Sequence, residues 1–328
     1  MPRFKVVITE PMPLVDEEMA ILKKTAAVKV CPSSDHDTIK KSVTDADVIM
    51  VVYARITGDI IESSKNLKGV VRYGVGVDNV DIKRATELGI VVANVPDYAT
   101  DAVADHAIAL LLTLVRRILV ANDFMSKRTF DSWTSPSESI RGTELRGKTL
   151  GLIGLGRIGT AVAERAKPFG MKIVTFDPYI SKRQAQQIGI EFADFDELLR
   201  ESDFISLHAP LSDETRGIIN AVTISKMKKG VFILNTARGP LIDTEALVVA
   251  LKSGKVAGAA LDVFPQEPPD TKDELLALEN VIKTPHIAWY TNESLRRLEM
   301  TAVQHTLDIL GGRIPANIVN KEALSRRH

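Results

Sequence analysis

The chain is 328 residues long, with 45% hydrophobic and 26% charged residues, which is ordinary for a globular protein and long enough for two domains. Lysine plus arginine and aspartate plus glutamate both number 42, and this zero net charge argues against a bulk electrostatic role on nucleic acid or on an anionic membrane. The single cysteine, Cys31, excludes an internal disulfide and a multi-cysteine metal site, and we interpret it as a strand-end residue rather than a nucleophile.

The first hundred residues alternate short apolar runs with polar, helix-like stretches. Runs of valine and isoleucine without polar alternation predict strands covered on both faces, as in a parallel sheet. The predicted strands are residues 5–9, 28–30, 47–52, 69–73 and 90–95, with crossover helices at 16–26 and 35–46. This order indicates an open, doubly wound α/β domain.

A long helix is predicted over residues 97–120, with Thr100 or Asp101 as its N-cap. Its apolar part carries charged residues, so it is interpreted as a buried amphipathic helix and not as a membrane span. The polar segment 122–146 is predicted to be irregular. Because the N-terminal apolar run is too short for a signal peptide, we expect a cytoplasmic protein.

A second α/β series follows. Its predicted strands are residues 149–156, 172–177, 204–210, 231–237, 258–264 and 281–286. The helices predicted between and after them are residues 158–169, 194–200, 221–229, 243–253 and 293–310. Six strands with helical crossovers are typical of a dinucleotide-binding domain.

The pattern G-x-G-x-x-G is formed by Gly154, Gly156 and Gly159, after an apolar run and before a helical one. In that context the first glycine makes a tight turn, the second lets the backbone approach a pyrophosphate, and the third permits close helix packing. Asp177 ends the next strand eighteen residues after Gly159, where a carboxylate binds the adenosine ribose and repels a 2′-phosphate. We therefore predict NAD over NADP; the alternative is a structural turn beside a solvated aspartate.

Three later strand ends carry reactive side chains: Arg238, Glu267 and His286. In a doubly wound sheet, ligands bind outside the carboxyl ends of the strands, so the three are expected to converge. A guanidinium can bind a substrate carboxylate, an imidazole can donate a proton as hydride arrives, and a carboxylate can fix the imidazole tautomer. Taken singly, each has an ordinary alternative: a surface ion pair, a capping carboxylate and a loop histidine bonded to the backbone.

The chain resembles the D-isomer-specific 2-hydroxyacid dehydrogenases over nearly its whole length. The motifs that carry the resemblance are YGVGVDNVD (73–81), GLGRIG (154–159), LHAPL (207–211), NTARGPLID (235–243), AALDVFPQEP (259–268) and TPHIAW (284–289). The resemblance implies that Arg238 binds substrate, Glu267 supports the histidine and His286 is the acid/base. It implies substrate contacts by the loop around Val75 and Gly76, and NAD contacts by Arg157, Ile158, His208, Thr236 and Asp262.

The resemblance also implies how the domains are arranged. A flavodoxin-like substrate domain would combine residues 1–99 with 291–328, and a Rossmann NAD-binding domain of residues 100–290 would be inserted in it. The active site would lie in the interdomain cleft and close over the substrate. Such enzymes are usually homodimers joined through their NAD-binding domains, with the arm at 122–146 exchanged, and no metal is expected.

Several branches of the family are compared by single residues. Formate dehydrogenases carry glutamine where Glu267 stands, whereas AWY (288–290) resembles bacterial relatives of the C-terminal-binding-protein corepressors, in which the position of Arg72 contacts substrate. Phosphoglycerate dehydrogenases usually have small residues after T-P-H-I, and many carry a C-terminal regulatory domain for which we expect this chain to be too short. Trp289 either walls the substrate pocket or is core, and Arg55 either reaches a phosphate or forms a surface pair.

The leading interpretation is therefore an NAD-dependent oxidoreductase that interconverts a D-2-hydroxy acid and its 2-oxo acid. The alternative is a dimeric NAD-sensing binding protein with little turnover, against which the lack of long disordered extensions argues. The sequence leaves open which 2-hydroxy acid is used, whether it is phosphorylated, and in which direction the reaction runs.

Overall fold

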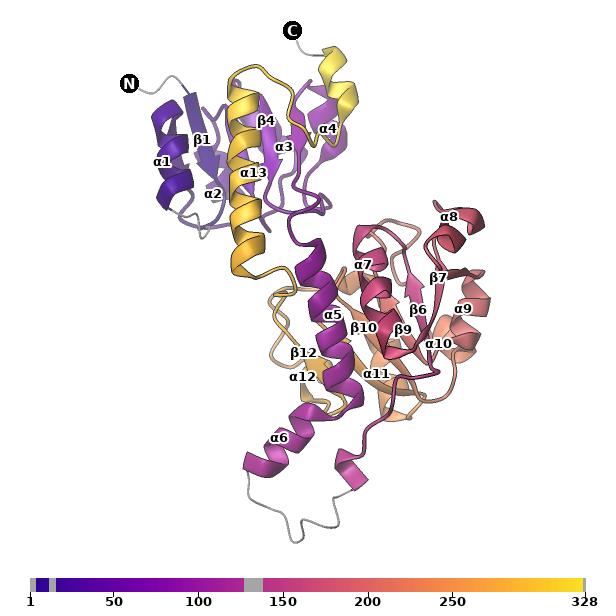
Figure 1. Cartoon of the computed structure of the whole chain (residues 1–328). Helices are drawn as coiled ribbons and strands as arrows, with labels where there is room; N and C mark the ends of the chain where they lie inside the picture. The colour runs from indigo at the N-terminus through magenta and orange to yellow at the C-terminus, as the bar shows by residue number, and fades with distance from the viewer. Residues whose placement is uncertain (1–3, 12–15, 127–137, 327–328) are drawn as a thin grey trace. The chain divides into compact units, whose positions relative to one another are not determined.

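A computed structural model describes residues 4–11, 16–126 and 138–326 of the chain. Two compact units are formed, unit 1 by Met1–Ala99 with Tyr290–His328 and unit 2 by Thr100–Trp289. Figure 1 shows the chain leaving unit 1 through α5 (Thr100–Val115) and returning to it through α13 (Asn292–Leu310). Unit 2 is thus an insertion in the sequence of unit 1.

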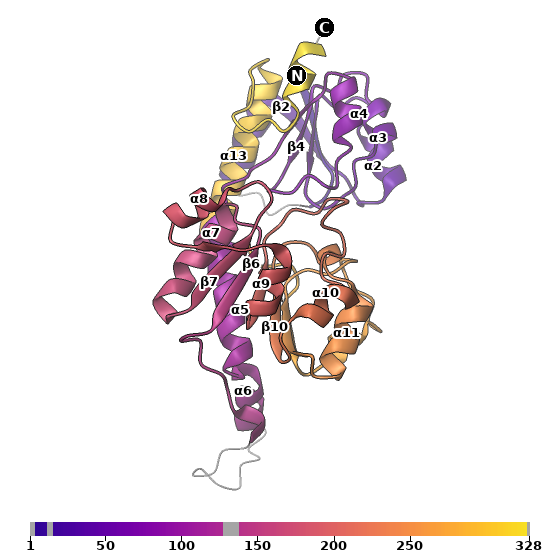
Figure 2. The same cartoon turned by 90° about the vertical axis from the view of Figure 1, so that its right-hand side faces the viewer.

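Unit 1 contains, within the described residues, a five-stranded parallel sheet in the order β2-β1-β3-β4-β5. The strands are β1 (Phe4–Ile8), β2 (Ala26–Val30), β3 (Val48–Val51), β4 (Gly69–Arg72) and β5 (Val91–Ala93). One face packs against α1 (Asp16–Thr25) and α13, and the other against α2 (His36–Ser42), α3 (Gly58–Ser63) and α4 (Ile82–Glu87). Figure 2 shows α13 on one side of this sheet and α2, α3 and α4 on the other. This strand order is that of flavodoxin-like folds.

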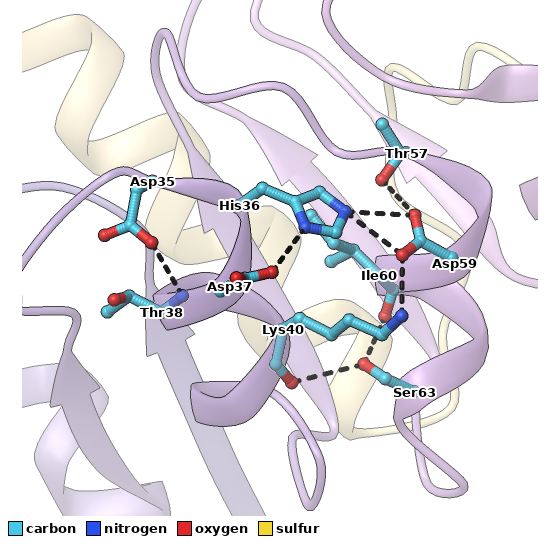
Figure 3. A network of polar contacts seen from close by, with 9 residues as sticks. All are labelled: Asp35, His36, Asp37, Thr38, Lys40, Thr57, Asp59, Ile60 and Ser63. Atoms are coloured by element: carbon cyan, nitrogen blue, oxygen red, sulfur yellow. Dashed lines mark hydrogen bonds and ion pairs between the residues drawn. The ribbon is translucent and has the colours of Figure 1, made fainter.

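A polar network links α2 to α3 on the surface of unit 1 (Figure 3). The carboxylate of Asp59 accepts hydrogen bonds from Lys40 Nζ at 2.7 Å and from Thr57 Oγ1 at 2.5 Å. His36 Nε2 lies 3.0 Å from the same carboxylate, and its Nδ1 lies 3.1 Å from Asp37. Because the side chains of His36, Asp37, Lys40 and Asp59 are between 43% and 83% exposed, the network contributes to the local attachment of two short helices and little to the core.

Unit 2 holds a seven-stranded parallel sheet among the residues that the structure describes, in the order β12-β11-β10-β9-β6-β7-β8. The strands are β6 (Thr149–Ile153), β7 (Lys172–Phe176), β8 (Glu191–Phe192), β9 (Phe204–Leu207), β10 (Val231–Asn235), β11 (Val256–Leu261) and β12 (Val281–Lys283). The order reverses between β6 and β9, and the carboxyl ends of these two strands therefore form the edge where dinucleotides bind in Rossmann folds.

Helices cover both faces of this second sheet and enclose two apolar core clusters. One face packs against α5 (Thr100–Val115), α7 (Arg157–Ala166) and α8 (Lys182–Gln187). The other packs against α9 (Phe195–Glu201), α10 (Ala221–Lys226), α11 (Thr244–Lys252) and α12 (Glu274–Ala277). The prediction of two doubly wound parallel sheets, with one domain inserted in the other, is confirmed.

Two predicted elements differ from the structure. The single helix predicted over 97–120 is wrong, because α5 ends at Val115 and α6 (Ile118–Ser126) follows a break at which Arg117 has φ 55°. The segment predicted to be irregular is therefore helical in its first part, and residues 127–137 of the proposed exchanged arm (122–146) lie outside the described residues. In the part of the chain that is described, no helix combines the length and apolarity needed to cross a membrane.

Candidate functional site

The loop after β6 contains three glycines, each with a different steric environment. Gly154 has φ 96°, and a Cβ there would lie 2.8 Å from backbone atoms of His208 and Ala209. A Cβ on Gly159 would lie 2.3 Å from the carbonyl oxygen of Gly154, so the first turn of α7 packs directly on the loop. Gly156, the N-cap of α7, is exposed, and a Cβ there would meet none of the described atoms within 4 Å. The fold requires the first and last glycines, whereas the middle one leaves space above the helix terminus.

Asp177 lies beside this loop, directly after β7. Its Oδ2 accepts the backbone N–H of Leu155 at 2.8 Å, and its Oδ1 accepts the N–H of Tyr179 at 2.8 Å. The first contact ties the carboxylate to the glycine loop itself. A ribose hydroxyl next to a pyrophosphate on the helix terminus would therefore meet a carboxylate that is already oriented.

Two more polar residues stand at this edge of the sheet. Thr236 follows β10 and is 9% exposed, and within the described chain its Oγ1 has no hydrogen-bond partner. His208 follows β9, with Nε2 2.9 Å from Ser206 Oγ, and burial lowers its pKa to about 4, which keeps the ring neutral at neutral pH. A buried hydroxyl without a partner is an unusual cost in a folded protein, and a ligand group at the site would remove it.

The first turn of α7 completes the fit to a dinucleotide. Arg157 is exposed at its first position, while the side chain of Ile158 is half-buried and packs on the core cluster below α5. Backbone N–H groups in the first turn of a helix have no intrahelical acceptor and attract phosphate. The side chain of Ile158 is thus structural, and its backbone N–H, in the first turn of α7, is the group that a phosphate could use. The residues present fit NAD.

Arg238 is held in a loop that is hydrogen-bonded to itself. Asn235 Nδ2 donates to the carbonyl of Arg238 at 2.8 Å, and Asn235 Oδ1 accepts the N–H of Ala237 at 3.0 Å. The half-buried guanidinium donates from Nη1 to the carbonyl of Ala237 at 2.7 Å. A Cβ on Gly239 would lie 2.0 Å from the carbonyl carbon of Phe264, so this loop is in direct contact with the segment that leads to Glu267.

Glu267 and His286 form a hydrogen-bonded pair. His286 Nδ1 lies 2.7 Å from Glu267 Oε2, and Glu267 Oε1 accepts the backbone N–H of Phe264 at 3.0 Å. Both side chains are largely covered, with 21% of the histidine and 32% of the glutamate exposed. The carboxylate at Nδ1 favours the tautomer with hydrogen on that nitrogen, which puts the lone pair of the ring on Nε2.

His286 has an unusual backbone conformation that depends on Asp262. Its φ is 55°, in the left-handed region, and its N–H donates to the carbonyl of Asp262 at 2.7 Å. The Asp262 carboxylate is fully buried and accepts the N–H groups of Ile287 and Ala288, each at 2.9 Å. Asp262, expected from the resemblance to contact NAD, is thus occupied by the turn that carries the histidine.

This carboxylate is also contacted by two residues that the sequence analysis did not identify. Thr284 Oγ1 donates to Asp262, and His106 Nε2 from α5 lies 3.2 Å from Thr284 Oγ1. Burial raises the pKa of Asp262, but hydrogen bonds from His106, Thr284 and the turn outweigh it, so the net direction is downward. The one available sequence signal was a histidine, beside Asp105, inside a largely apolar helical stretch.

The residues of unit 1 that were expected to bind substrate differ in how far they are exposed. Arg72 is 8% exposed; its Nη1 donates to the carbonyl of Tyr73 at 2.6 Å and lies 1.4 Å from where a Cβ on Gly74 would stand. Val75 is 40% exposed, Gly76 is half-buried, and Arg55 is exposed. Trp289, the last residue of unit 2, is half-buried.

Known proteins similar to this chain identify its family. The model for the NAD-binding domain of D-isomer-specific 2-hydroxyacid dehydrogenases matches residues 108–288. A hydroxypyruvate reductase of Thermotoga maritima is 42% identical over 317 residues, which cover 95% of this chain and 100% of that protein. The chain belongs to the D-isomer-specific 2-hydroxyacid dehydrogenase family. The predicted NAD-binding domain is confirmed by the same match.

Other members of this dehydrogenase family extend the comparison. A D-3-phosphoglycerate dehydrogenase of Methanocaldococcus jannaschii is 42% identical over 319 residues, 96% of this chain, but this chain spans only 59% of that protein's length. The crystal structure of D-lactate dehydrogenase from Aquifex aeolicus, complexed with NAD and lactic acid, gives a TM-score of 0.86 at 34% identity and covers 96% of this chain and 98% of that one.

Proposed function

We propose that the protein is an NAD-dependent oxidoreductase that interconverts a D-2-hydroxy acid and its 2-oxo acid. The observation that carries the proposal is the 2.7 Å pair of His286 and Glu267, which lies at the carboxyl edge of the sheet that also carries the glycine loop. The names of the relatives support the same reaction class, since they include a hydroxypyruvate reductase and a D-lactate dehydrogenase.

His286 acts as the acid and base. In the reducing direction its Nε2 would donate a proton to the ketone oxygen, and NADH, when bound, would supply the hydride to the carbonyl carbon. In the oxidising direction the neutral ring accepts the hydroxyl proton. Glu267 at Nδ1 orients the ring and stabilises its protonated form, because a charge-assisted hydrogen bond is stronger than a neutral one.

Arg238 binds the substrate carboxylate. Its planar guanidinium matches the geometry of a carboxylate, and the contact of Gly239 with Phe264 keeps its loop next to the segment that carries Glu267. An acid substrate held by Arg238 would present its neighbouring carbon to His286. This arrangement selects 2-oxo acids over simple ketones, because a ketone lacks the charged group that the arginine binds.

The cofactor is bound by the edge between β6 and β9. The first turn of α7, with Gly156 at its N-cap and the backbone N–H groups of Arg157 and Ile158, would hold the pyrophosphate, and Asp177 would hold the adenosine ribose. His208, Thr236 and Asp262 lie toward the reactive end. We expect NAD rather than NADP, because a 2′-phosphate would meet the Asp177 carboxylate; equal use of both cofactors would contradict this assignment.

Substrate selection is assigned to four residues. Val75 and Gly76 would offer backbone N–H groups to the substrate carboxylate, Arg72 would support their loop through its hydrogen bond to the carbonyl of Tyr73, and Trp289 would limit the size of the substrate side chain. A Trp289→Ala variant should accept longer 2-oxo acids than the wild type does. An unchanged chain-length preference would show that this tryptophan serves only the core.

The function is tested by following NADH consumption with a panel of 2-oxo acids. Glyoxylate, hydroxypyruvate, phosphohydroxypyruvate and a branched 2-oxo acid are each supplied with NADH and with NADPH. We expect turnover of at least one substrate with NADH, and loss of most of it in His286→Gln with NADH binding retained. NADH binding without turnover of any of the acids would favour the alternative, an NAD-sensing binding protein.

We further infer that the protein forms a homodimer through unit 2. Among the described residues α6 buries no side chain, and Ile118, Leu119 and Met125 are 51%, 54% and 46% exposed. Three large apolar side chains on one short helix are typical of an interface. Light scattering should give twice the chain mass for the wild type and a smaller mass for Leu119→Glu; a monomeric wild type would contradict the inference.

A further inference from the structure

The backbone of His286 is held in a conformation that few residues other than glycine adopt. Its φ of 55° lies in the left-handed region. Such a conformation persists only where the surroundings determine it, and it commonly marks functional positions. The direction in which the imidazole leaves the backbone is therefore set by whatever holds this turn.

Asp262 holds the turn with both its backbone carbonyl and its side-chain carboxylate. Its carbonyl oxygen accepts the N–H of His286 at 2.7 Å, and its carboxylate accepts the next two N–H groups, of Ile287 at Oδ1 and Ala288 at Oδ2, each at 2.9 Å. Three successive backbone donors thus converge on one buried residue. If this carboxylate rotates, the N–H groups lose their common acceptor and the turn can relax.

The orientation of the carboxylate is set in turn by Thr284 and His106. The hydroxyl of Thr284 has one hydrogen, which it donates to Asp262 Oδ1. His106 Nε2, 3.2 Å from that hydroxyl oxygen and 3.5 Å from Oδ1, must therefore be the donor toward both. The hydrogen bonds run from His106 through Thr284 to Asp262, and from there to the turn.

We propose that His106 is a positioning residue that acts through Thr284 and Asp262 to fix the backbone turn of His286. The role rests on the proposed function, in which His286 is the acid and base. His106 belongs to α5, which packs against β10, β11 and β12, so its imidazole is anchored on an element independent of the loop that it orders. Without its N–H, the threonine hydroxyl and the carboxylate lose the donor that fixes them.

Three variants test this chain of contacts. His106→Phe keeps an aromatic ring but removes the donor, His106→Gln restores an N–H, and Thr284→Val keeps the shape of the threonine but removes its hydroxyl. The matched control is Asp105→Asn, on the neighbouring residue of α5, whose side chain is 69% exposed and pairs with Arg165. It changes the same helix without touching the network.

We expect His106→Phe and Thr284→Val to lower kcat about ten- to a hundredfold, since a shift of about 1 Å in a catalytic group costs up to about a hundredfold. KM for the 2-oxo acid and Kd for NADH should stay within about twofold, His106→Gln should recover most of kcat, and Asp105→Asn should behave as wild type. The proposal would be overturned if kcat fell as far in His106→Gln as in His106→Phe. It would also be overturned if the affinity for NADH fell by as large a factor as kcat.

A second measurement does not depend on turnover. Crystal structures of the wild type and of His106→Phe or Thr284→Val should show φ of residue 286 leaving the left-handed region, or Nδ1 of His286 moving out of hydrogen-bond range of Glu267, in the variants only. An unchanged turn in the variants would overturn the positioning role even in a protein that reduces none of the acids tested. Absence of turnover in the wild type would instead count against the proposed function.

Discussion

The two glycines at the start of α7 give a sharp test of where the cofactor binds. Gly159 lies inside the first turn, where a Cβ would stand 2.3 Å from the carbonyl oxygen of Gly154. Gly156 caps the helix with φ −72°, and a Cβ there would meet nothing described within 4 Å. The same methyl group should therefore affect the fold at one site and only a ligand at the other.

The expected stabilities can be worked from these contacts. In Gly159→Ala, overpacking against the backbone costs about 1–3 kcal/mol or more, and the helix propensity of alanine returns about 1 kcal/mol. In Gly156→Ala, the weaker N-cap costs about 0.5 kcal/mol, and the reduced freedom of the unfolded chain returns about as much. We expect the melting temperature to fall in Gly159→Ala and to stay within about 2 °C of wild type in Gly156→Ala.

Cofactor affinity should show the opposite pattern for Gly156→Ala. If the pyrophosphate approaches this backbone, an added methyl group meets it with the same overpacking cost, which corresponds to about a ten- to hundredfold rise in the Kd for NADH. Fluorescence titration of NADH together with thermal melts separates the two effects. Wild-type affinity in a stable Gly156→Ala protein would refute the assignment of this loop to the pyrophosphate.

Three further predictions concern charge. Glu267→Gln should lower kcat about ten- to a hundredfold with NADH affinity unchanged, because the charge-assisted bond to His286 is worth about 1.5–3 kcal/mol; equal kcat values would contradict its role. Hydrogen bonds to Asp37 and Asp59 raise the pKa of His36, so the stability that protonated His36 gives the folded protein is fully present below about pH 6.5 and is lost as the pH rises through the raised pKa. The difference in urea midpoint between wild type and His36→Gln should therefore shrink from about pH 6 to about pH 9. A constant difference would count against the link between α2 and α3 in Figure 3. Burial lowers the pKa of His208 to about 4, so the unfolded chain takes up a proton at this residue that the folded protein does not, and the free energy of unfolding should decrease as pH falls from about 6.5 toward 4. His208→Gln should make the dependence of stability on acid pH shallower. An unchanged dependence would contradict this assignment.

The strands were predictable because both sheets are parallel and buried on both faces. Runs such as Val48–Val51 and Phe204–Leu207 are entirely buried, so their composition alone distinguishes them from helices and loops. The edge strand β8 was not predicted, because it is not buried on both faces. It consists of Glu191 and Phe192, neither of them buried, and two residues give no periodicity to read.

The break between α5 and α6 could not be predicted from local signals. Arg116 and Arg117 are good helix formers, and no glycine or proline stands at the junction. The left-handed conformation of Arg117 accompanies a hydrogen bond from its Nε to the carbonyl of Ser139, more than twenty residues away in sequence. A contact at that separation leaves no trace in a window of one helix length.

The candidate site shows the same division between strand-end chemistry and tertiary contacts. The pairing of Glu267 with His286, and the contact between the loop of Arg238 and the segment that leads to Glu267, agree with the rule that parallel strands end at one edge. The residue types alone led to the hypothesis of acid–base chemistry on an acid substrate. The orientation of the histidine has another origin. The left-handed turn depends on Asp262 and on a hydrogen-bond donor from α5, and this donor, His106, lies 178 residues before Thr284 in the sequence. A sequence can name the reacting groups because their chemistry belongs to the residue, whereas the geometry that makes them react belongs to contacts that exist only after folding.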